Sequence, residues 1–495
     1  MGLMHDSAAS EDIDYRYVMG IDLGTTNSAV AYADLTSRQD HPGDRRIHTL
    51  AVPQLVATGE VARRPVLPSF LYLPGPHELP SGGTSLPWEQ QRDYMVGEFA
   101  REQGALVPGR LVSSAKSWLC HGGVSRTDPI LPWGPEEEVQ KVSPVEASAR
   151  YLLHIREAWN HLMARGRDEN RLEHQLIILT VPASFDEVAR ELTVTAAREA
   201  GMERVILLEE PLAAFYAWLS HHESDWQEEM RAGQLILICD VGGGTSDFTI
   251  LAIREGERGL RFDRLAVGDH LMLGGDNMDL TLGRHLEAKL LGKPGKLESN
   301  RWRQLFHQCR RAKETLLSDS AGDASMEITV LGSGAKLIAD VLKATITRKE
   351  VERLIIEGFF PFVSPGEMPR EERRTGLTEL GLPYVQDPAI TRHLSSFWKR
   401  FQTLLHKETE REILYPDFLL CNGGALTPIS IRDRLHQVVT RWFEDSAEEN
   451  WTPRELHNPS LELAVAVGAA YYGLVRLGQG VRVGAGSPRA YYAGV

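Results

Sequence analysis

Two glycine-bearing turns carry the residue types that bind anions and cations. The first is Asp22-Leu-Gly-Thr-Thr-Asn-Ser28, in which small residues let backbone N–H groups approach an anion and hydroxyls can donate further hydrogen bonds. Its aspartate ends an apolar run and can hold a hydrated cation. A plain hairpin, with Gly and Asn satisfying the turn geometry, explains the same residues equally well. This turn alone leaves both interpretations open.

The second turn, Asp240-Val-Gly-Gly-Gly-Thr-Ser-Asp247, is harder to explain as structure alone. Three consecutive glycines cost backbone entropy, and the close approach of a bulky anion would justify them. Asp240 and Asp247 could then hold Mg²⁺ through water, because Mg²⁺ favours one or two carboxylates together with phosphate oxygens. The P-loop pattern GxxxxGK[ST] does not occur in the sequence. Two facing hairpins would therefore have to bind the anion together.

Two further motifs follow apolar runs. Glu209-Glu210-Pro211 places Glu210 at a helix start, where the helix dipole favours a carboxylate. Glu210 is then either a capping group or a group that orients the attacking water in phosphoryl transfer. The paired glycines of Asn422-Gly-Gly-Ala-Leu-Thr-Pro428 would let a flat ligand or its phosphate lie against the backbone, and a structural turn explains them just as well.

Short apolar runs rich in Ile, Leu and Val must position these motifs, and each predicts a buried central strand. The runs are Val18–Asp22, Leu176–Pro182, Val205–Glu210, Leu235–Asp240 and Phe418–Gly424. Helical patterns between the runs predict an α/β architecture. Ser184-Phe-Asp-Glu187 has the pattern of a capping box that starts a helix ending at Gly201, and Pro211 suits the first turn of a helix over Leu212–Leu219.

The segments VMGIDLGTTNSAVAYADL and LILICDVGGGTSDFTIL share one plan: an apolar strand ending in Asp, a small-residue turn and a second strand. Their aspartates are 240 − 22 = 218 residues apart, which predicts two related lobes that each present one such loop. We expect lobe I at 15–232, with a peripheral subdomain at about 50–140, and lobe II at 233–457. Lobe II is expected to carry a peripheral subdomain at about 273–349 and an insertion at about 361–400. A C-terminal helix at 458–480 would return to lobe I, followed by a tail at 481–495.

Composition limits the function classes. The 495 residues are 42% hydrophobic and 25% charged, the balance of a protein that buries a sizeable core. A net charge of −14 disfavours a general affinity for nucleic acid or anionic membrane, because both need a basic face. The four cysteines are far apart and form no CxxC pair, which suits a reducing compartment. Without a signal-peptide pattern or a run of ~18 apolar residues, we expect a soluble cytoplasmic protein.

In combination, the motifs resemble those of the actin-like ATPase superfamily and, more narrowly, the nucleotide-binding domain of Hsp70-type chaperones. They occur in the order DLGTTNS, VPASF, EEPLAAFYAW, DVGGGTSD, LGGDNMD, NGGALTP and NPSLELAVAVGAA, from about Tyr17 to Leu477. The resemblance implies an α/β fold of two lobes, each with a mixed central sheet flanked by helices, and a nucleotide cleft between them. It also implies ATP or ADP with Mg²⁺, and K⁺ as a further ion. The implied activity is hydrolysis of ATP to ADP and phosphate with lobe closure as the output, in a chaperone-related role.

The family's site residues can be placed by position. The first phosphate loop would consist of Gly24, Thr25, Thr26 and Asn27, and the second of Gly242, Gly243, Gly244 and Thr245. Asp22 and Asp240 would hold hydrated Mg²⁺ with Asp247 close to the ions, and Glu210 would position the water or accept its proton. The nucleoside side of the cleft would be lined by Gly274, Gly275, Lys313, Gly423 and Gly424. Pro182 and Arg190 match a pair that relays the nucleotide state outward. The catalytic set that the resemblance implies is Asp22, Arg101, Glu210, Asp240 and Thr245.

The sequence departs from the family pattern near the phosphates and near the base. Hsp70s have a catalytic lysine shortly after a Val-Gly pair, and here Val96-Gly97-Glu-Phe-Ala-Arg101 puts Arg101 there. A planar guanidinium would sit differently on a γ-phosphate, so hydrolysis is expected to be slow or lost. The helix that offers Lys and Arg to the nucleoside appears as Arg311-Ala-Lys313-Glu314, and the second base-stacking Arg is replaced by Ala425, Leu426 and Thr427. Weaker affinity or looser base selectivity is expected.

The resemblance also bears on partners. Ile206 stands where Hsp70s that work with J-domain proteins have Arg, so a conventional J-domain partner is not expected. The chain stops within about 20 residues of Leu477, so we expect no peptide-binding module in it and a partner chain or domain that supplies substrate binding. It would be a stand-alone ATPase domain or the front part of a longer protein. A non-hydrolysing nucleotide-binding scaffold, a small-molecule kinase of the same superfamily and an actin-like filament former remain alternatives.

Overall fold

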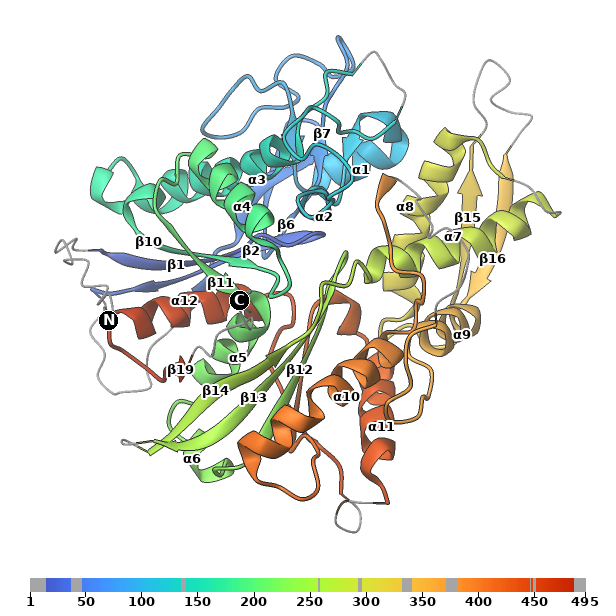
Figure 1. The fold of residues 1–495 in the computed structure, drawn as a ribbon. Coiled ribbons are helices and arrows are strands. Elements are labelled where there is room, and N and C mark those ends of the chain that lie inside the picture. The colour runs from blue at the N-terminus through green and yellow to red at the C-terminus, as the bar shows by residue number, and fades with distance from the viewer. Residues whose placement is uncertain are drawn as a thin grey trace, which may run out of the picture.

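The structure is a computed structural model that describes residues 15–36, 47–134, 139–256, 259–292, 296–331, 341–370, 381–445, 447 and 451–484. Two lobes face each other, and each is built on a six-stranded mixed sheet covered by helices (Figure 1). The α/β prediction is therefore confirmed.

The first sheet has the strand order β11-β10-β1-β2-β3, and β6 also pairs with β2. Its centre is an antiparallel hairpin of β1 (Tyr17–Asp22) and β2 (Asn27–Asp34), with β10 (Leu176–Val181) and β11 (Val205–Glu209) added in parallel. The short strands β3 (His48–Thr49) and β6 (Leu67–Pro68) complete the sheet.

The second sheet has the order β18-β17-β12-β13-β14-β19. It repeats the plan of the first: β12 (Leu235–Val241) and β13 (Ser246–Gly256) form a hairpin, and β17 (Phe418–Asn422) and β18 (Arg454–Leu456) are added in parallel. Strands β14 (Gly259–Val267) and β19 (Val483–Gly484) extend the other edge. The repeat seen in the sequence is thus a repeat of the hairpin and its parallel neighbours. All five predicted strands form, but β11 lies at the edge of its sheet and is only partly buried, so the prediction of a buried central strand is wrong there.

Helices cover both sheets. They are α3 (Pro144–Trp159), α4 (Glu187–Glu199), α5 (Glu210–His221), α6 (Trp226–Glu229), α10 (Ile390–Thr409), α11 (Ile429–Phe443) and α12 (Ala464–Arg476). The predicted capping box is wrong, because the N-cap of α4 is Asp186, whose side chain accepts from the Ala189 N–H at 2.7 Å. The Ser184 hydroxyl instead contacts His270 Nδ1 at 2.7 Å.

Helices α5 and α12 cross between the two sheets, and small residues allow their close approach. A Cβ on Gly468 would overlap the carbonyl oxygen of Ala213 in α5, and one on Gly20 of β1 would overlap that of Ala466 in α12. Helix α12 packs on β1, and α5 packs on β12 of the second sheet. This helix pair therefore joins the two lobes (Figure 1).

Smaller units flank each sheet. Beside the first lie β4 (Val52–Ala57), β5 (Glu60–Arg64), β7 (Leu71–Tyr72), β8 (Met95–Val96), α1 (Glu98–Leu106), β9 (Leu111–Val112) and α2 (Ala115–Trp118). Beside the second lie α7 (Gly275–Leu291), α8 (Ser299–Leu316), β15 (Ser325–Val330), β16 (Leu342–Thr347) and α9 (Arg348–Phe359). Helices α1 and α8 contact each other across the cleft.

Two predicted peripheral segments contain regular structure. The last part of the expected insertion at about 361–400 belongs to α10, which starts at Ile390 and packs on β13 and β14, while 371–380 lie outside the described residues. Within the expected tail, Val483–Gly484 pair with β14, and 485–495 lie outside the description.

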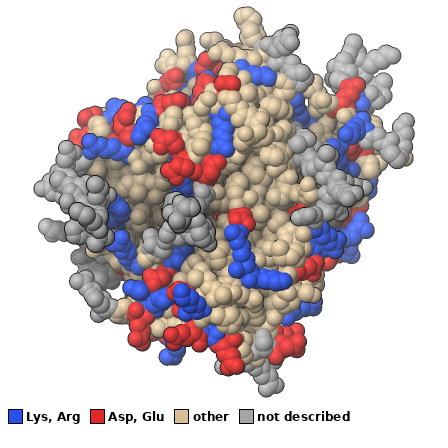
Figure 2. All heavy atoms as spheres, viewed as in Figure 1, with Lys and Arg blue, Asp and Glu red and all other residues tan. Residues whose placement is uncertain are grey.

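On the face shown in Figure 2, Lys and Arg are interspersed with Asp and Glu. None of the helices in the described ranges is long and apolar enough to cross a membrane.

Candidate functional site

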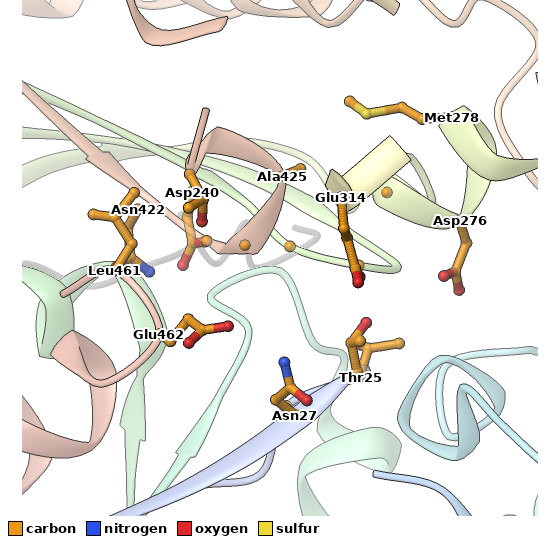
Figure 3. A pocket seen from close by; sticks show the side chains of 18 of the residues that line it. Thr25, Asn27, Asp240, Asp276, Met278, Glu314, Asn422, Ala425, Leu461 and Glu462 are labelled. Atoms are coloured by element: carbon orange, nitrogen blue, oxygen red, sulfur yellow. The ribbon is translucent and has the colours of Figure 1, made fainter. Parts of the chain in front are cut away.

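A cavity of about 440 Å³ lies between the two lobes, and both hairpins contribute to its wall. Figure 3 shows Thr25 and Asn27 on one side of this space and Asp240 and Glu314 on another. Most of the residues predicted from the sequence line it: Asp22, Gly24, Thr25, Thr26, Asn27, Glu210, Asp240, Gly242, Gly243, Thr245, Gly275, Lys313, Gly423 and Gly424. The cavity therefore joins motifs that are hundreds of residues apart in the sequence.

The two glycine-bearing turns meet so closely that side chains would not fit between them. A Cβ on Gly243 would overlap Thr26 Oγ1, and one on Gly244 would overlap Ser117 Oγ and lie 3.1 Å from Thr25 Cγ2. The Gly242 N–H donates to Thr245 O at 2.9 Å, which closes the second turn. The consecutive glycines are thus explained by the approach of the opposite lobe as well as by space for an anion.

Three carboxylates converge at the closed end of the cavity: Asp240 is buried, and Asp22 and Glu210 are partly buried. Thr180 Oγ1 donates to Asp22 Oδ1 at 3.1 Å, and Asn422 of β17 is the register partner of Asp240. Burial and the neighbouring Glu210 carboxylate raise the pKa of Asp22 to about 7. Burial, followed by Glu210 and Asp247, raises the pKa of Asp240 well above its usual value. Burial also raises the pKa of Glu210, against the opposing effect of Lys116.

Lys116 supplies the positive charge at this end. Its ammonium donates to Glu210 Oε1, and its side chain is only 7% exposed. When ionised, the three carboxylates and this ammonium carry −3 + 1 = −2. Because one divalent cation would balance that charge, the donor set fits Mg²⁺.

Arg101 is not among the described residues that line the cavity, and the expectation that it takes the place of the family lysine stays a prediction. Arg101 lies on α1, 37% exposed, and its guanidinium bonds to Glu102 at 3.1 Å. The side chain that reaches Glu210 comes from α2, fifteen residues further on. The sequence gives little sign of this, because a four-residue helix has no periodicity to read.

Three other predicted residues lie outside the cavity wall. Asp247 sits behind Asp240, its register partner, and its Oδ1 accepts from the Ser184 N–H at 3.0 Å. The Gly274 N–H donates to Asn277 Oδ1 at 2.9 Å at the start of α7, and Gly244 packs against Ser117. These three residues do not line the cavity, and they pack or hydrogen-bond next to residues that do.

A buried charge network on α7 and α8 forms the lobe II wall. Arg310 donates to Asp276 Oδ1 at 2.6 Å and to Asp279 Oδ2 at 3.0 Å, and Lys313 pairs with Asp279 at 2.7 Å. The N–H groups of Gly275 and Asp276 donate to Gly242 O and Gly243 O, so the first turn of α7 is tied to the second hairpin. Sequence reasoning found Lys313 and missed Arg310, although Arg310 and Lys313 have the i, i+3 spacing of one helix face.

The open end of the cavity is acidic and apolar. It is lined by Glu314, Leu317, Ser318 and Asp319 from α8 and its end, and by Ala425, Thr427, Pro428 and Ile431. The Glu314 side chain points into the space (Figure 3), and burial raises the pKa of its carboxyl group. Among the described residues that line the cavity, Arg310 is the one arginine, and both of its partners are carboxylates.

The expected relay pair lies at a second contact between the lobes. Arg190 donates to Glu209 Oε1 at 2.9 Å and to Ala183 O at 3.2 Å, next to Pro182. Arg264 of β14 also pairs with Glu209, so this carboxylate contacts cations of both lobes. Ile206 is half-buried in β11.

Two lobes with repeated hairpins around a cavity of about 440 Å³ define a protein of the actin-like ATPase class. The model of the family described as "Hsp70 protein" matches residues 88–365, more than half of the chain. The chain belongs to the Hsp70 family and carries a nucleotide-binding domain of that type.

Curated relatives are named "Chaperone protein HscA homolog". The one from Burkholderia orbicola (strain MC0-3) is 31% identical over 338 residues, 66% of this chain and 45% of the relative. The one from Pseudoalteromonas atlantica is 29% identical over 354 residues, 67% of this chain and 48% of the relative. The chain spans about half the length of the curated relatives it matches.

Proposed function

We propose that this chain binds ATP with Mg²⁺ in the cleft and hydrolyses it to ADP and phosphate, with closure of the lobes as the output. The observation that carries the proposal is the charge pattern at the closed end, where three carboxylates and one ammonium, paired with Glu210, lie beside two glycine-bearing turns. Membership of the Hsp70 family supports the same activity.

Each part of the wall has a role in this proposal. Backbone N–H groups and hydroxyls of the two turns, from Thr25 and Thr26 on one side and Gly242 to Thr245 on the other, donate to phosphate oxygens. Mg²⁺ would supply positive charge that neutralises the phosphate oxygens. Asp22 and Asp240 would hold its water ligands. In the described ranges no three His, Cys, Asp or Glu side chains are placed to hold a metal ion directly, which fits coordination through water and phosphate.

Glu210 and Lys116 act on the water in this mechanism. Lys116 holds Glu210 Oε1, which leaves Oε2 to accept a proton from the water as its oxygen attacks the γ-phosphorus. The bond from the γ-phosphorus to the bridging oxygen breaks, and ADP leaves with that oxygen. The burial that raises the pKa of Glu210 makes its carboxylate a better proton acceptor near neutral pH. The slow rate expected from the sequence depended on Arg101 as the positive charge next to the phosphates. We assign that role to Lys116 instead.

A non-hydrolysing scaffold is the second candidate, and the Lys116–Glu210 ion pair itself favours it. A carboxylate held by an ammonium is a weaker base than a free one, because the positive charge stabilises the ionised form. In that case nucleotide binding and closure would remain without turnover.

We further propose that lobe closure is read by a partner chain or domain that binds the substrate. The relatives named as chaperones support a role of this kind, and the match covers about half of their length. The J-domain expectation based on Ile206 and the K⁺ expectation stay predictions.

Release of phosphate from Mg·ATP tests the proposal. The wild-type protein should turn over, and D240N and E210A should lose activity at least about 100-fold, as when a group that stabilises the transition state is removed. E102Q changes an exposed carboxylate outside the cavity and serves as the control. If the wild-type protein releases phosphate no faster than D240N but its melting temperature rises with ATP, the non-hydrolysing scaffold is favoured. No rise with ATP, ADP or GTP would contradict both.

A further inference from the structure

Helix α2 lies between the two lobes, and three polar side chains in it or next to it contact three different parts of the site. Ser114 Oγ donates to Asp276 Oδ2 of α7 at 2.8 Å, and Lys116 donates to Glu210 of α5. Ser117 Oγ is buried next to Gly244 of the second turn and finds no hydrogen-bond partner among the described residues. The position of this one short helix therefore sets the position of Lys116 relative to both lobes.

Ser114 is in an unusual conformation for its residue type. Its backbone has φ 54° and ψ 30°, in the left-handed region that non-glycine residues rarely adopt. A serine before a helix ordinarily accepts a hydrogen bond from a first-turn N–H, yet Ser114 makes no such cap. Its hydroxyl is directed across the cleft instead, and strain of this kind is typical of functional positions.

Asp276, which accepts the hydrogen bond from the Ser114 hydroxyl, is itself held by several contacts. Its other oxygen accepts from Arg310 at 2.6 Å, and Arg310 is held by Asp279, which also pairs with Lys313. Asp276 is 2% exposed, and its backbone N–H is bonded to Gly243 O. In Figure 3 its carboxylate points from α7 toward the side of the cavity that carries Thr25 and Asn27. The hydrogen bond therefore joins α2 of lobe I to a rigid part of lobe II.

We propose that Ser114 and Asp276 are positioning residues, whose hydrogen bond places α2, and with it Lys116, in its working position when the lobes are closed. Closure of the lobes then also places the Lys116 ammonium beside Glu210. When the cleft is open, Lys116 is displaced from this position. The inference rests on the proposed function for the role of Lys116. Neither positioning residue acts on the reacting atoms itself.

The test separates the hydrogen bond from the backbone strain. S114G removes the hydroxyl but suits the left-handed backbone, so folding should be retained and the melting temperature should not fall. S114N keeps a side-chain donor and a residue type that tolerates this conformation. We expect S114G to lower kcat about tenfold with the affinity for Mg·ATP changed less than threefold, and S114N to stay within about threefold of wild type, since the contact acts on a positioned charge. S125A, in the exposed loop beyond α2, is the control.

A double-mutant cycle and a chemical probe complete the test. D276N combined with S114G should cost no more kcat than the larger single effect, because both changes break one contact. Acylation of Lys116 by an amine-reactive reagent, followed by mass spectrometry with Mg·ATP present, should rise at least fivefold in S114G. This readout needs no turnover, so absent hydrolysis in the wild type would count against the proposed function alone. Unchanged kcat and acylation in S114G, or a loss confined to nucleotide affinity, would overturn the positioning role.

Discussion

At the scale of single residues, the charge balance of the cleft depends on Lys116. Its side chain is nearly fully buried, and its partner Glu210 lies within interaction range of Asp22 and Asp240. Removing the ammonium would leave three carboxylates facing one another, and their pKa values would rise further, because like charges disfavour ionisation. A protonated Glu210 could no longer accept a proton from water.

K116A should therefore lower phosphate release by about 100-fold or more, the usual effect of losing a preorganised charge at a reaction centre. R101A is the matched control, since Arg101 is exposed and bonded to Glu102, and it should change the rate less than about threefold. Steady-state phosphate release at saturating Mg·ATP checks both variants. A large loss in R101A with little loss in K116A would return the role to Arg101.

Glu314 sets the charge at the open end of the cavity. Its carboxylate points into the space (Figure 3), and the one arginine among the described lining residues, Arg310, is bonded to two carboxylates. E314R should raise the affinity for ATP several-fold, because a guanidinium both stacks on an aromatic ring and attracts a polyphosphate. Titration of melting temperature or calorimetry with ATP would measure it. E314Q, which removes charge without adding a stacking group, should give a smaller gain, and equal gains would contradict the stacking argument.

At the scale of elements, the crossing of α5 and α12 depends on glycine. G468A places a Cβ into the carbonyl oxygen of Ala213, and helix backbones cannot yield as flexible side chains can. We expect the melting temperature to fall, with about 2 kcal/mol or more lost from the free energy of unfolding. G358A on α9 is the control, because a Cβ there meets nothing within 4 Å. It should be neutral or stabilising by up to about 1 kcal/mol, and equal effects of the two changes would contradict the packing argument.

The elements also mark where sequence reasoning succeeds. Strands such as β12, buried along all seven residues, were predictable because burial on both faces produces an uninterrupted apolar run. Asp22 and Asp240 were predictable because each ends such a run beside a small-residue turn. Lys116 and Ser114 were not, since their contacts, Glu210 and Asp276, come from distant segments. The cap at Asp186 was missed because the hydroxyl of Ser184 is used by His270, a partner 86 residues away.

At the scale of the whole molecule, buried histidines affect stability in acid. His154 is buried in α3, its Nε2 contacts Pro53 O at 2.9 Å, and burial lowers its pKa from 6.5 to about 4. Above pH 6.5 it is neutral both folded and unfolded and adds no pH dependence. As the pH falls from 6.5 toward 4, the unfolded chain takes up a proton that the folded protein does not, and stability is lost, by at most about 3 kcal/mol.

H154Q should remove the pH-dependent contribution of His154 to stability while keeping a hydrogen-bond donor for Pro53 O. The difference in melting temperature between H154Q and wild type should therefore shift in favour of the variant between pH 7 and pH 4. Comparing the two proteins at each pH cancels His307, whose pKa burial lowers to about 3 in both. H174Q, at an exposed histidine, is the control. A difference that does not change with pH would contradict the assigned pKa of His154.

The carboxylates of the cleft lower the stability of the nucleotide-free protein, although the proposed function requires them. Without a cation, Asp240 faces Glu210, Asp247 and Asp22 in a buried site, which raises its pKa and disfavours the folded state at neutral pH. D240N removes one of these charges, so the nucleotide-free variant should melt a few degrees higher than wild type. It should also lose the gain from Mg·ATP, which for wild type is about 2.7 kcal/mol at a ligand concentration of 100 Kd, and EDTA should abolish that gain in wild type. D269N, at an exposed aspartate, should change neither quantity. A nucleotide-free D240N that melts below wild type would mean that Asp240 stabilises the fold, and the charge argument for a divalent cation would fail with it.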